Sequence, residues 1–526
     1  MQELKFEELT VEQKLGLVLN IHINPWLRTP EWDKFFFTQL EKRAIGSIWI
    51  QSDITDSDKM IQLIRDKAEY PVLIITDAES GIYDYRIGKH NAVGRTGSEE
   101  HAYAFGKVVG VAARKKGYDV VCNPLLDMSN FGSTRCIGRD KYEVARIAKA
   151  VAKGLHDAGI LTVGKHYPSA LGGEKFIDTH MAECISYETK EELIETNLFP
   201  YAELMKEGLL DGIMTGHDRL PNIDPDKPAS LSRKVIDIIR EMGFDGFAIT
   251  DALIMMGIKA KYGEEDPIGL AIAAGNDISM PFGCRSEDAE KNYNYMLDCY
   301  KKGMIDDARL DEAVKRVLAA QHKAFMNIKN PEYTAEELET FNNIDKDAVF
   351  AKADEGLLPS VSRDGKHLFA VMVRNETDLN GQRVTEDTFT NGWHHPYKIQ
   401  QKLNELFPNS KVLFVREFPT SDDNLQVFNG SIECEDTIFL TFSEAIPYVG
   451  MERLTGRIES LFEALQVTNR VSTVVHFGNP LVLGNLPHIP RYILGGTSAP
   501  SVNACIDVLA GLYPAKGKLT YDVKLN

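Results

Sequence analysis

The stretch VARIAKAVAKGLHDAGILTVG, residues 144–164, contains an amphipathic helix followed directly by a buried strand. Four apolar residues recur at helical spacing and lie on one helix face: Val144, Ile147, Val151 and Leu155. The run ILTVG that follows is short, apolar and rich in β-branched residues, as strands buried in parallel sheets are. This succession predicts a parallel sheet whose strands are joined by helices.

Further apolar runs repeat the same alternation outward from this stretch through the first ~330 residues. They predict strands at 46–51, 71–76, 118–122, 160–164, 211–215, 244–250 and 277–281. An early strand near 17–22 brings the count to eight. The sequence therefore favours an α/β fold built on a TIM-like (β/α)8 barrel over an open doubly wound sheet.

Local signals support several of the connecting helices. Thr10 and Gln13 are spaced as a capping box at the first helix. A later helix is predicted to bury one face that consists of Ile194, Leu198, Tyr201 and Met205.

The polar stretch NIKNPEYTAEELETFNNIDKD, residues 327–347, interrupts the alternation and contains Pro331. We expect a linker here, with the barrel domain at 1–335 and a second α/β domain at 336–526. The second domain is indicated by the runs LFAVMV, KVLFV, TIFLTF and STVVHF, which helical segments separate.

Composition excludes several classes of function. A formal net charge of -18 argues against nucleic acids or anionic membranes as partners, because both select clustered Lys and Arg. The seven cysteines are scattered, odd in number and without C-x-x-C, as expected for free thiols in a reducing compartment. The opening MQELKFEELTVEQK does not resemble a signal peptide, and no apolar run reaches membrane-spanning length. We expect a cytoplasmic protein without a cofactor.

Ionisable residues follow five of the predicted strands directly. Barrel enzymes place their reactive groups at the carboxyl ends of the strands, so these residues form one candidate site. They are Asp77, Asp127, the pair Lys165 and His166, the pair His217 and Asp218, and Asp251. Such a set predicts carboxylates that bind hydroxyl groups, together with at least one nucleophile or base.

Several of these segments resemble glycoside hydrolase family 3, in particular its β-N-acetylglucosaminidases. GKHYP at 164–168, followed by DTH at 178–180, is similar to the family's K-H-F-P-G…D-S-H segment. MTGHDRLPNIDPDKPASLS and GFDGFAITDALIMMGI resemble its M-T-A-H…P-A-t-L-S and G-F-D-G…S-D-D-L-S-M signatures. IITDAESG and NPLLDM agree more loosely. HFGNP and the closing KGKLTYDV resemble its second domain, an α/β sandwich.

The resemblance implies a retaining, exo-acting enzyme that removes a terminal β-linked N-acetylhexosamine from a small carbohydrate. It implies that Asp251 is the nucleophile and that His180 is the acid/base, with Asp178 orienting its ring. An intact Asp-x-His favours N-acetylhexosamines over glucosides. The substrate-binding residues would be Asp77, Asp127, Arg139, Lys165, His166 and His217.

Three departures from the family pattern are visible. The loop between Pro168 and Asp178 is longer than usual and lacks G-H-G, and its glycines, Gly172 and Gly173, suggest mobility. Ala252 replaces the second Asp of S-D-D, and Ser80 replaces the first Gly of E-G-G.

Three alternatives remain open at this point. In a phosphorylase of the same fold, phosphate rather than water would attack the intermediate. A non-catalytic sugar-binding protein could also use this scaffold. A metal-dependent barrel hydrolase would use His166, His180, His217 and Asp251 as ligands, but His22 stands alone where that class has H-x-H, so no metal is expected.

Overall fold

The structure, a computed structural model, describes residues 2–52, 54–129, 134–169, 178–282, 288–327, 330–373, 396–446, 450–451 and 453–525. The chain forms two compact units. The first comprises Met1–Arg86, Glu99–Phe131 and Asp140–Phe341, and the second comprises Ile87–Ser98, Gly132–Arg139 and Asn342–Asn526.

A curled sheet of seven parallel strands forms the centre of the first unit. In spatial order its strands are β1 (Asn20–Ile23), β2 (Ser47–Ile50), β3 (Leu73–Thr76), β6 (Val120–Val121), β7 (Leu161–Tyr167), β8 (Gly212–Thr215) and β9 (Phe247–Thr250). Spatial order follows chain order, as it does in a barrel. Apolar side chains of these strands fill the interior, including Trp49, Val163 and Phe247.

The predicted strand at 277–281 occupies the eighth position, but only as isolated bridges. Ile278 pairs with Ile249 of β9, and Ser279 pairs with Leu19 before β1, both in parallel. Regular pairing fails because Asp277 N and Ile278 N both donate to Ala248 O, at 2.7 and 3.0 Å. The fold is therefore the expected barrel-like arrangement, with an irregular eighth segment between the two edge strands.

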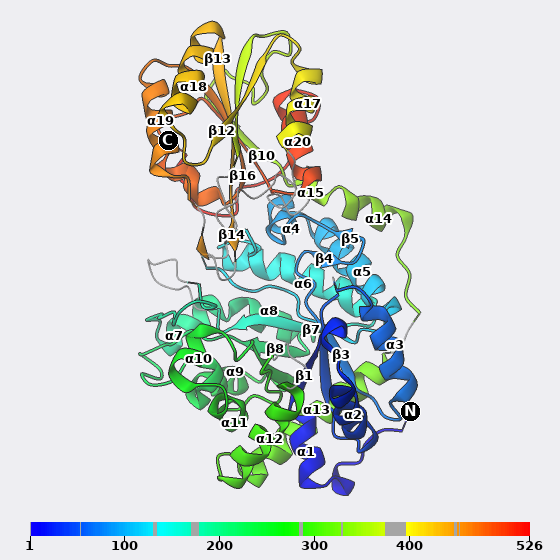
Figure 1. Cartoon of the computed structure of the whole chain (residues 1–526). Helices are drawn as coiled ribbons and strands as arrows, with labels where there is room; N and C mark the ends of the chain where they lie inside the picture. Colours follow the sequence, from blue (N-terminus) through cyan, green and yellow to red (C-terminus); the bar gives the residue numbers. More distant parts are fainter. Residues whose placement is uncertain are drawn as a thin grey trace. The chain divides into compact units, whose positions relative to one another are not determined.

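Helices cover the outside of this sheet (Figure 1). They are α1 (Val11–Leu17), α2 (Pro30–Glu41), α3 (Ser57–Lys67), α5 (Glu99–Lys115), α6 (Lys141–Asp157), α7 (Lys190–Glu192), α8 (Phe199–Lys206), α9 (Arg233–Glu241), α10 (Met256–Tyr262), α11 (Asp266–Ala273), α12 (Asp288–Lys301) and α13 (Asp307–Met326). A short hairpin, β4 (Gly81–Ile82) and β5 (Tyr85–Arg86), follows β3. The predicted apolar face of α6 is buried, and the capping box of Thr10 and Gln13 is present.

The predicted face of the helix before β8 is partly wrong. Leu198 and Tyr201 are buried, but Ile194 is 37% exposed and Met205 is only half-buried. A π-helical turn at Leu193–Asn197 separates α7 from α8 and shifts the register. Two leucines that regular α spacing did not select, Leu193 and Leu204, are fully buried in consequence.

The second unit is built on a six-stranded mixed sheet. In spatial order its strands are β10 (Phe350–Ala353), β17 (Arg491–Gly495), β16 (Val471–Gly478), β13 (Asp436–Ser443), β11 (His367–Val373) and β12 (Lys411–Arg416). Only β10 is antiparallel to its neighbour. A two-stranded ribbon, β14 (Ala445–Ile446) and β15 (Gly450–Met451), follows β13.

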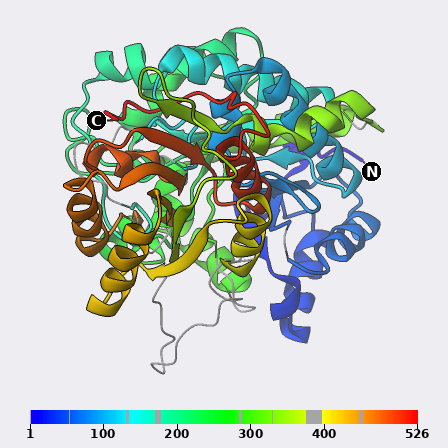
Figure 2. The same ribbon diagram turned by 90° about the horizontal axis from the view of Figure 1, so that it is seen from above.

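Helices lie on both faces of this second sheet. Figures 1 and 2 show α18 (Ser421–Glu433) and α19 (Gly456–Gln466) on one side, with α17 (Pro396–Leu406) and α20 (Ala499–Leu509) on the other. This is the expected α/β sandwich. The same unit includes α4 (Asn91–Thr96), and the predicted linker contains α14 (Ala335–Asn342) and α15 (Ile344–Asp347).

No helix in the described part of the chain is long and apolar enough to cross a membrane.

Candidate functional site

Ionisable side chains lie at the carboxyl ends of β3, β7, β8 and β9, which together form one end of the barrel. Parallel register places these ends side by side, since Lys165 pairs with Met214 and Thr215 pairs with Thr250. The residues predicted after the strands therefore meet around Asp251.

Lys165, on β7, lies fully buried between two carboxylates that follow β3. Its Nζ donates to Asp77 Oδ1 and forms an ion pair with Glu79 Oε1 at 2.6 Å. A buried ammonium requires such partners. The outer carboxylate, Asp77, keeps 37% of its side chain exposed and remains accessible to a ligand.

His166, the next residue on β7, lies between two carboxylates. Its Nδ1 is 2.6 Å from Asp127 Oδ2, and its Nε2 is 3.8 Å from Asp251 Oδ2. The backbone N of His166 also donates to Asp127 Oδ1 at 2.9 Å. Burial alone would lower the pKa of His166, but Asp127 and Asp251 together raise the pKa above its usual value. The ring therefore favours the imidazolium form, with Nδ1–H donating to Asp127.

Asp251 follows β9, and its carboxylate is held in the ionised form. Burial would raise its pKa, but the charge of His166 and the N–H of Ala252, whose nitrogen lies 2.7 Å from Oδ1, lower the pKa below the usual range. An ionised, partly accessible carboxylate at this position can act as a nucleophile.

His217, after β8, is fully enclosed beside Asp251. Its Nδ1 is 2.9 Å from Ser230 Oγ, and its Nε2 is 3.0 Å from the carbonyl oxygen of Ala252. Burial lowers the pKa of His217 despite the nearby Asp251 charge. A carbonyl can only accept, so the neutral ring carries its proton on Nε2 and accepts the Ser230 hydroxyl at Nδ1. The hydrogen bond from His217 to Ala252 therefore holds the residue after Asp251 against the loop that follows β8.

Asp178 and His180 form a hydrogen-bonded pair in the segment that follows β7. His180 Nδ1 is 2.6 Å from Asp178 Oδ1, and His180 N donates to the same oxygen at 3.0 Å. Asp178 is buried, whereas the His180 side chain is 22% exposed. The carboxylate therefore fixes the ring with Nδ1 protonated, the tautomer in which Nε2 is the nitrogen that can exchange a proton.

Two neighbouring elements hold the segment that carries this pair. On one side, Ile185 forms an isolated β-bridge with Arg219, and the Arg219 side chain forms an ion pair with Glu183 at 2.9 Å. On the other side, Met256 N and Gly257 N donate to the carbonyl oxygens of His180 and Thr179, at 3.1 and 3.3 Å. The position of His180 is thus determined by the loop after β8 and by α10.

Arg139 belongs to a different compact unit from the other predicted site residues. It belongs to the second compact unit, where its backbone N donates to Thr520 O at 3.1 Å. Its role in substrate binding remains a prediction. The glycine loop that contains Gly172 and Gly173 lies outside the described residues.

Among the residues that the structure describes, no three His, Cys, Asp or Glu side chains form a group that could hold a metal ion. His166 and His217, two of the ligands in the metal-dependent alternative, are instead engaged by Asp127 and Ser230.

Sequence reasoning missed one contributor to the site, Glu79, and left another, Asp218, without a role. Glu79, two residues after Asp77, shares the charge of Lys165, and its place in the motif around Asp77 was the available signal. Asp218 follows His217 but was not assigned a role. Burial raises the pKa of Asp218 to about 7, against a hydrogen bond with Cys184 that lowers it. Cys184 belongs to the segment that carries the Asp178/His180 pair, and nothing in the sequence marks it as a partner.

Comparison with known proteins gives a family match over most of the first unit. Residues 10–320 match the model described as "Glycosyl hydrolase family 3 N terminal domain". A beta-hexosaminidase of Tolumonas auensis is 30% identical over 243 residues, 43% of this chain and 71% of that protein. A beta-N-acetylglucosaminidase/beta-glucosidase of Cellulomonas fimi is 24% identical over 298 residues, and the match spans 52% of each chain.

Solved structures share the complete fold. A family 3 beta-N-acetylglucosaminidase from Paenibacillus sp. str. FPU-7 superposes with a TM-score of 0.77 at 22% identity, over 98% of this chain and 100% of that one. A beta-glucoside phosphorylase, BglX, superposes with a TM-score of 0.79 at 20% identity, over 98% and 94%. At these identities the likeness establishes the fold alone.

Proposed function

The chain belongs to glycosyl hydrolase family 3, and we propose that it is a retaining, exo-acting β-N-acetylglucosaminidase. The observation that supports this most is the ionised Asp251 after β9 together with the hydrogen-bonded Asp178/His180 pair, whose segment is hydrogen-bonded to α10, the helix that follows Asp251. A nucleophile and a histidine acid/base are the two groups that double displacement needs.

In the proposed first step, Asp251 Oδ attacks the anomeric carbon while His180 Nε2–H protonates the departing glycosidic oxygen. Asp178 stabilises the imidazolium that donates this proton. In the second step, neutral His180 takes a proton from water as the water attacks the same carbon and releases Asp251. Each of the two displacements inverts the anomeric carbon, so the overall stereochemistry is retained, and one residue serves first as acid and then as base.

The remaining charged groups are suited to hold the sugar. Asp77 is accessible and can accept from a sugar hydroxyl group, and the buried Lys165 ammonium holds that carboxylate in place. His166 lies near Asp251 and can donate to the sugar beside the reacting carbon. These contacts supply binding energy that is used at the reacting centre.

The choice of an N-acetylhexosamine rests on the Asp178/His180 pair and on relatives whose names include beta-hexosaminidase. We propose a small β-N-acetylglucosaminide as natural substrate. A muropeptide fragment of cell-wall recycling and a chitin-derived oligosaccharide are the two classes to compare.

A phosphorylase is the second candidate. A solved relative of this fold is named a beta-glucoside phosphorylase, and a neutral histidine base repels incoming phosphate less than a carboxylate would. A non-catalytic sugar-binding protein is the third, and the intact Asp251 and Asp178/His180 pair argue against it.

The test compares aryl β-N-acetylglucosaminide with aryl β-glucoside, each with and without phosphate, in the native protein and in Asp251→Asn. We expect turnover of the first substrate to free sugar in both buffers, and a loss of roughly ten-thousand-fold in the variant. A sugar 1-phosphate product would establish the phosphorylase, and binding without turnover would establish the non-catalytic protein.

A further inference from the structure

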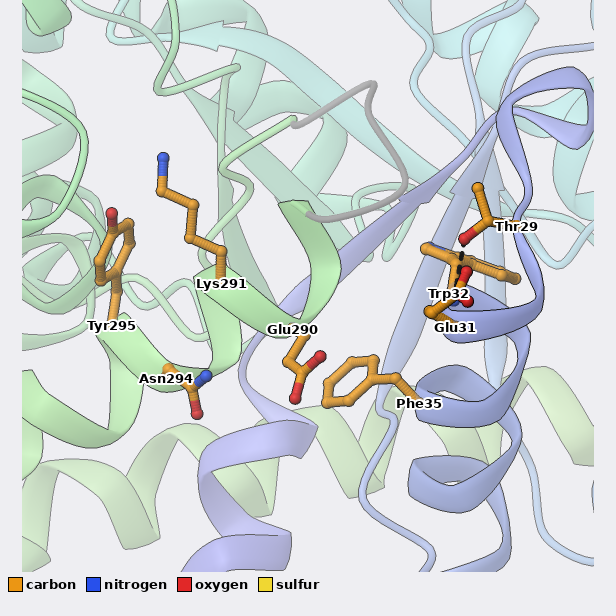
Figure 3. Close-up of a pocket in the computed structure, with 8 residues that line it drawn as sticks. All are labelled: Thr29, Glu31, Trp32, Phe35, Glu290, Lys291, Asn294 and Tyr295. Carbon is orange, nitrogen blue, oxygen red and sulfur yellow. Dashed lines mark hydrogen bonds between the residues drawn. The ribbon is translucent and has the colours of Figure 1, made fainter.

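A groove separate from the candidate site lies between α2 and α12 (Figure 3). Its volume of about 600 Å³ lies within the ~300–1,000 Å³ that is usual for small-molecule sites. The side chains that matter for its chemistry are Glu31, Trp32, Phe35, Glu290, Asn294 and Tyr295.

Aromatic rings give the groove apolar surface that is fixed in place. Phe35 is half-buried and packs edge-on against Tyr293, with ring centroids 6.2 Å apart. Trp32 is 4% exposed and stacks on Phe36 at 4.7 Å. Trp32 supports the wall of the groove, and the half-buried Phe35 is the ring that can contact the C–H groups of a sugar or a cation.

Two exposed carboxylates, Glu31 and Glu290, flank Phe35, and the nearby cations that the structure describes form ion pairs with other carboxylates. Lys291 is paired with Glu264 at 3.0 Å, and Arg28 binds both oxygens of Asp33 at 2.7 and 2.8 Å. Within the described chain, neither Glu31 nor Glu290 has an ion-pair partner. Figure 3 shows Glu290 directed toward Phe35, across the groove. Among the described residues, the groove lining therefore carries two carboxylates against one lysine, an excess of negative charge beside the ring of Phe35.

Stabilisation of α2 and α12 is a competing explanation for the presence of the two carboxylates. Glu31 and Glu290 both lie in the first turn of their helices, where negative charge is favourable. That role explains why each residue is acidic, but it requires neither the cavity nor the aromatic rings that face it.

We propose that this groove binds a sugar that carries a protonated amine, such as a glucosamine unit of a partly deacetylated oligosaccharide. The ammonium group would lie between Glu31, Glu290 and the ring of Phe35, and Asn294 would bind a hydroxyl group. The choice of a sugar rests on the proposed function, whereas the need for a cation rests on the groove alone. Acetylation removes the charge, so N-acetylglucosamine should not bind here.

The test is an NMR saturation-transfer titration of the full chain with glucosamine and with N-acetylglucosamine. We compare Glu290→Gln with Glu41→Gln, a matched control at the far end of α2. Glucosamine affinity should fall roughly tenfold in Glu290→Gln and in Phe35→Ala, and it should be unchanged in Glu41→Gln. Both aryl glycoside turnover and N-acetylglucosamine binding should be the same in all four proteins.

Two results would overturn the proposal: no glucosamine binding to the native chain, or equal binding in Glu290→Gln. In either case the only effect of the two carboxylates would be to stabilise the N-terminal turns of α2 and α12. The proposed function is judged separately, because native aryl β-N-acetylglucosaminide turnover does not depend on this groove.

Discussion

At the scale of single residues, the charge of His166 keeps Asp251 ionised. The imidazolium Nε2 lies 3.8 Å from Asp251 Oδ2 and lowers the pKa of that carboxyl. Loss of the charge in His166→Gln should raise the Asp251 pKa and move the acidic limb of the kcat/KM profile upward by about one pH unit. The position of the limb, rather than the rate, is the readout, since His166 also binds substrate in our proposal. His322→Gln, an exposed control whose ring contacts Glu3, should leave the limb in place.

Asp218 predicts a pH dependence of stability. Burial raises its pKa in the folded protein to about 7 from 3.8, so the folded state holds this proton more tightly than the unfolded chain. Its ionisation therefore destabilises the fold as pH rises from about 4 to about 7, and the penalty is constant above that range. Denaturant unfolding should show Asp218→Asn gaining stability relative to the native protein between pH 5 and pH 8, on the order of 2–4 kcal/mol. An equal difference at the two pH values would show that Asp218 titrates normally.

At the scale of elements, close packing of α10 against the Asp178/His180 segment determines where the acid/base lies. A Cβ at Gly257 would stand 3.0 Å from Thr179 O and 3.1 Å from Ala182 O. Gly257→Ala should lower kcat roughly tenfold at nearly unchanged KM, because His180 moves while the sugar contacts remain. Helix propensity alone would make this substitution stabilising by roughly 0.5–1 kcal/mol, so thermal unfolding separates the two effects. Gly456→Ala in α19, where nothing lies within 4 Å, is the control that should leave kcat unchanged.

Some elements follow the local sequence pattern, and others depend on structure that the pattern does not specify. Strand ends and the α6 face follow local periodicity, and both could be predicted. The π turn at Leu193–Asn197 could not, because one added residue shifts the buried face from Ile194 to Leu193 without a sequence signal. The ion pair of Glu79 with Lys165 depends on the carboxyl ends of β3 and β7 lying at the same end of the barrel, which local sequence does not specify.

At the scale of the whole molecule, the second unit recruits two segments from within the barrel part of the sequence. Gly88 N donates to both oxygens of Asp345, at 3.1 and 2.9 Å, and Lys518 N donates to Arg95 O at 2.7 Å. A chain that ends at residue 342 would expose 87–98 and 132–139 without these partners. We expect it to be cut by protease within those segments and to unfold at lower temperature than the full chain. Equal protease resistance would show that the first unit folds independently.

The most direct test of the central claim is to identify the residue that becomes glycosylated during turnover. His180→Asn should still react with a dinitrophenyl β-N-acetylglucosaminide, whose leaving group needs no acid, but it lacks the base for the second step. We predict a burst of dinitrophenolate, and peptide mass spectrometry should find one N-acetylhexosaminyl group on Asp251. A burst with the sugar on another residue, or steady turnover without any adduct, would contradict the assignment of Asp251 as nucleophile.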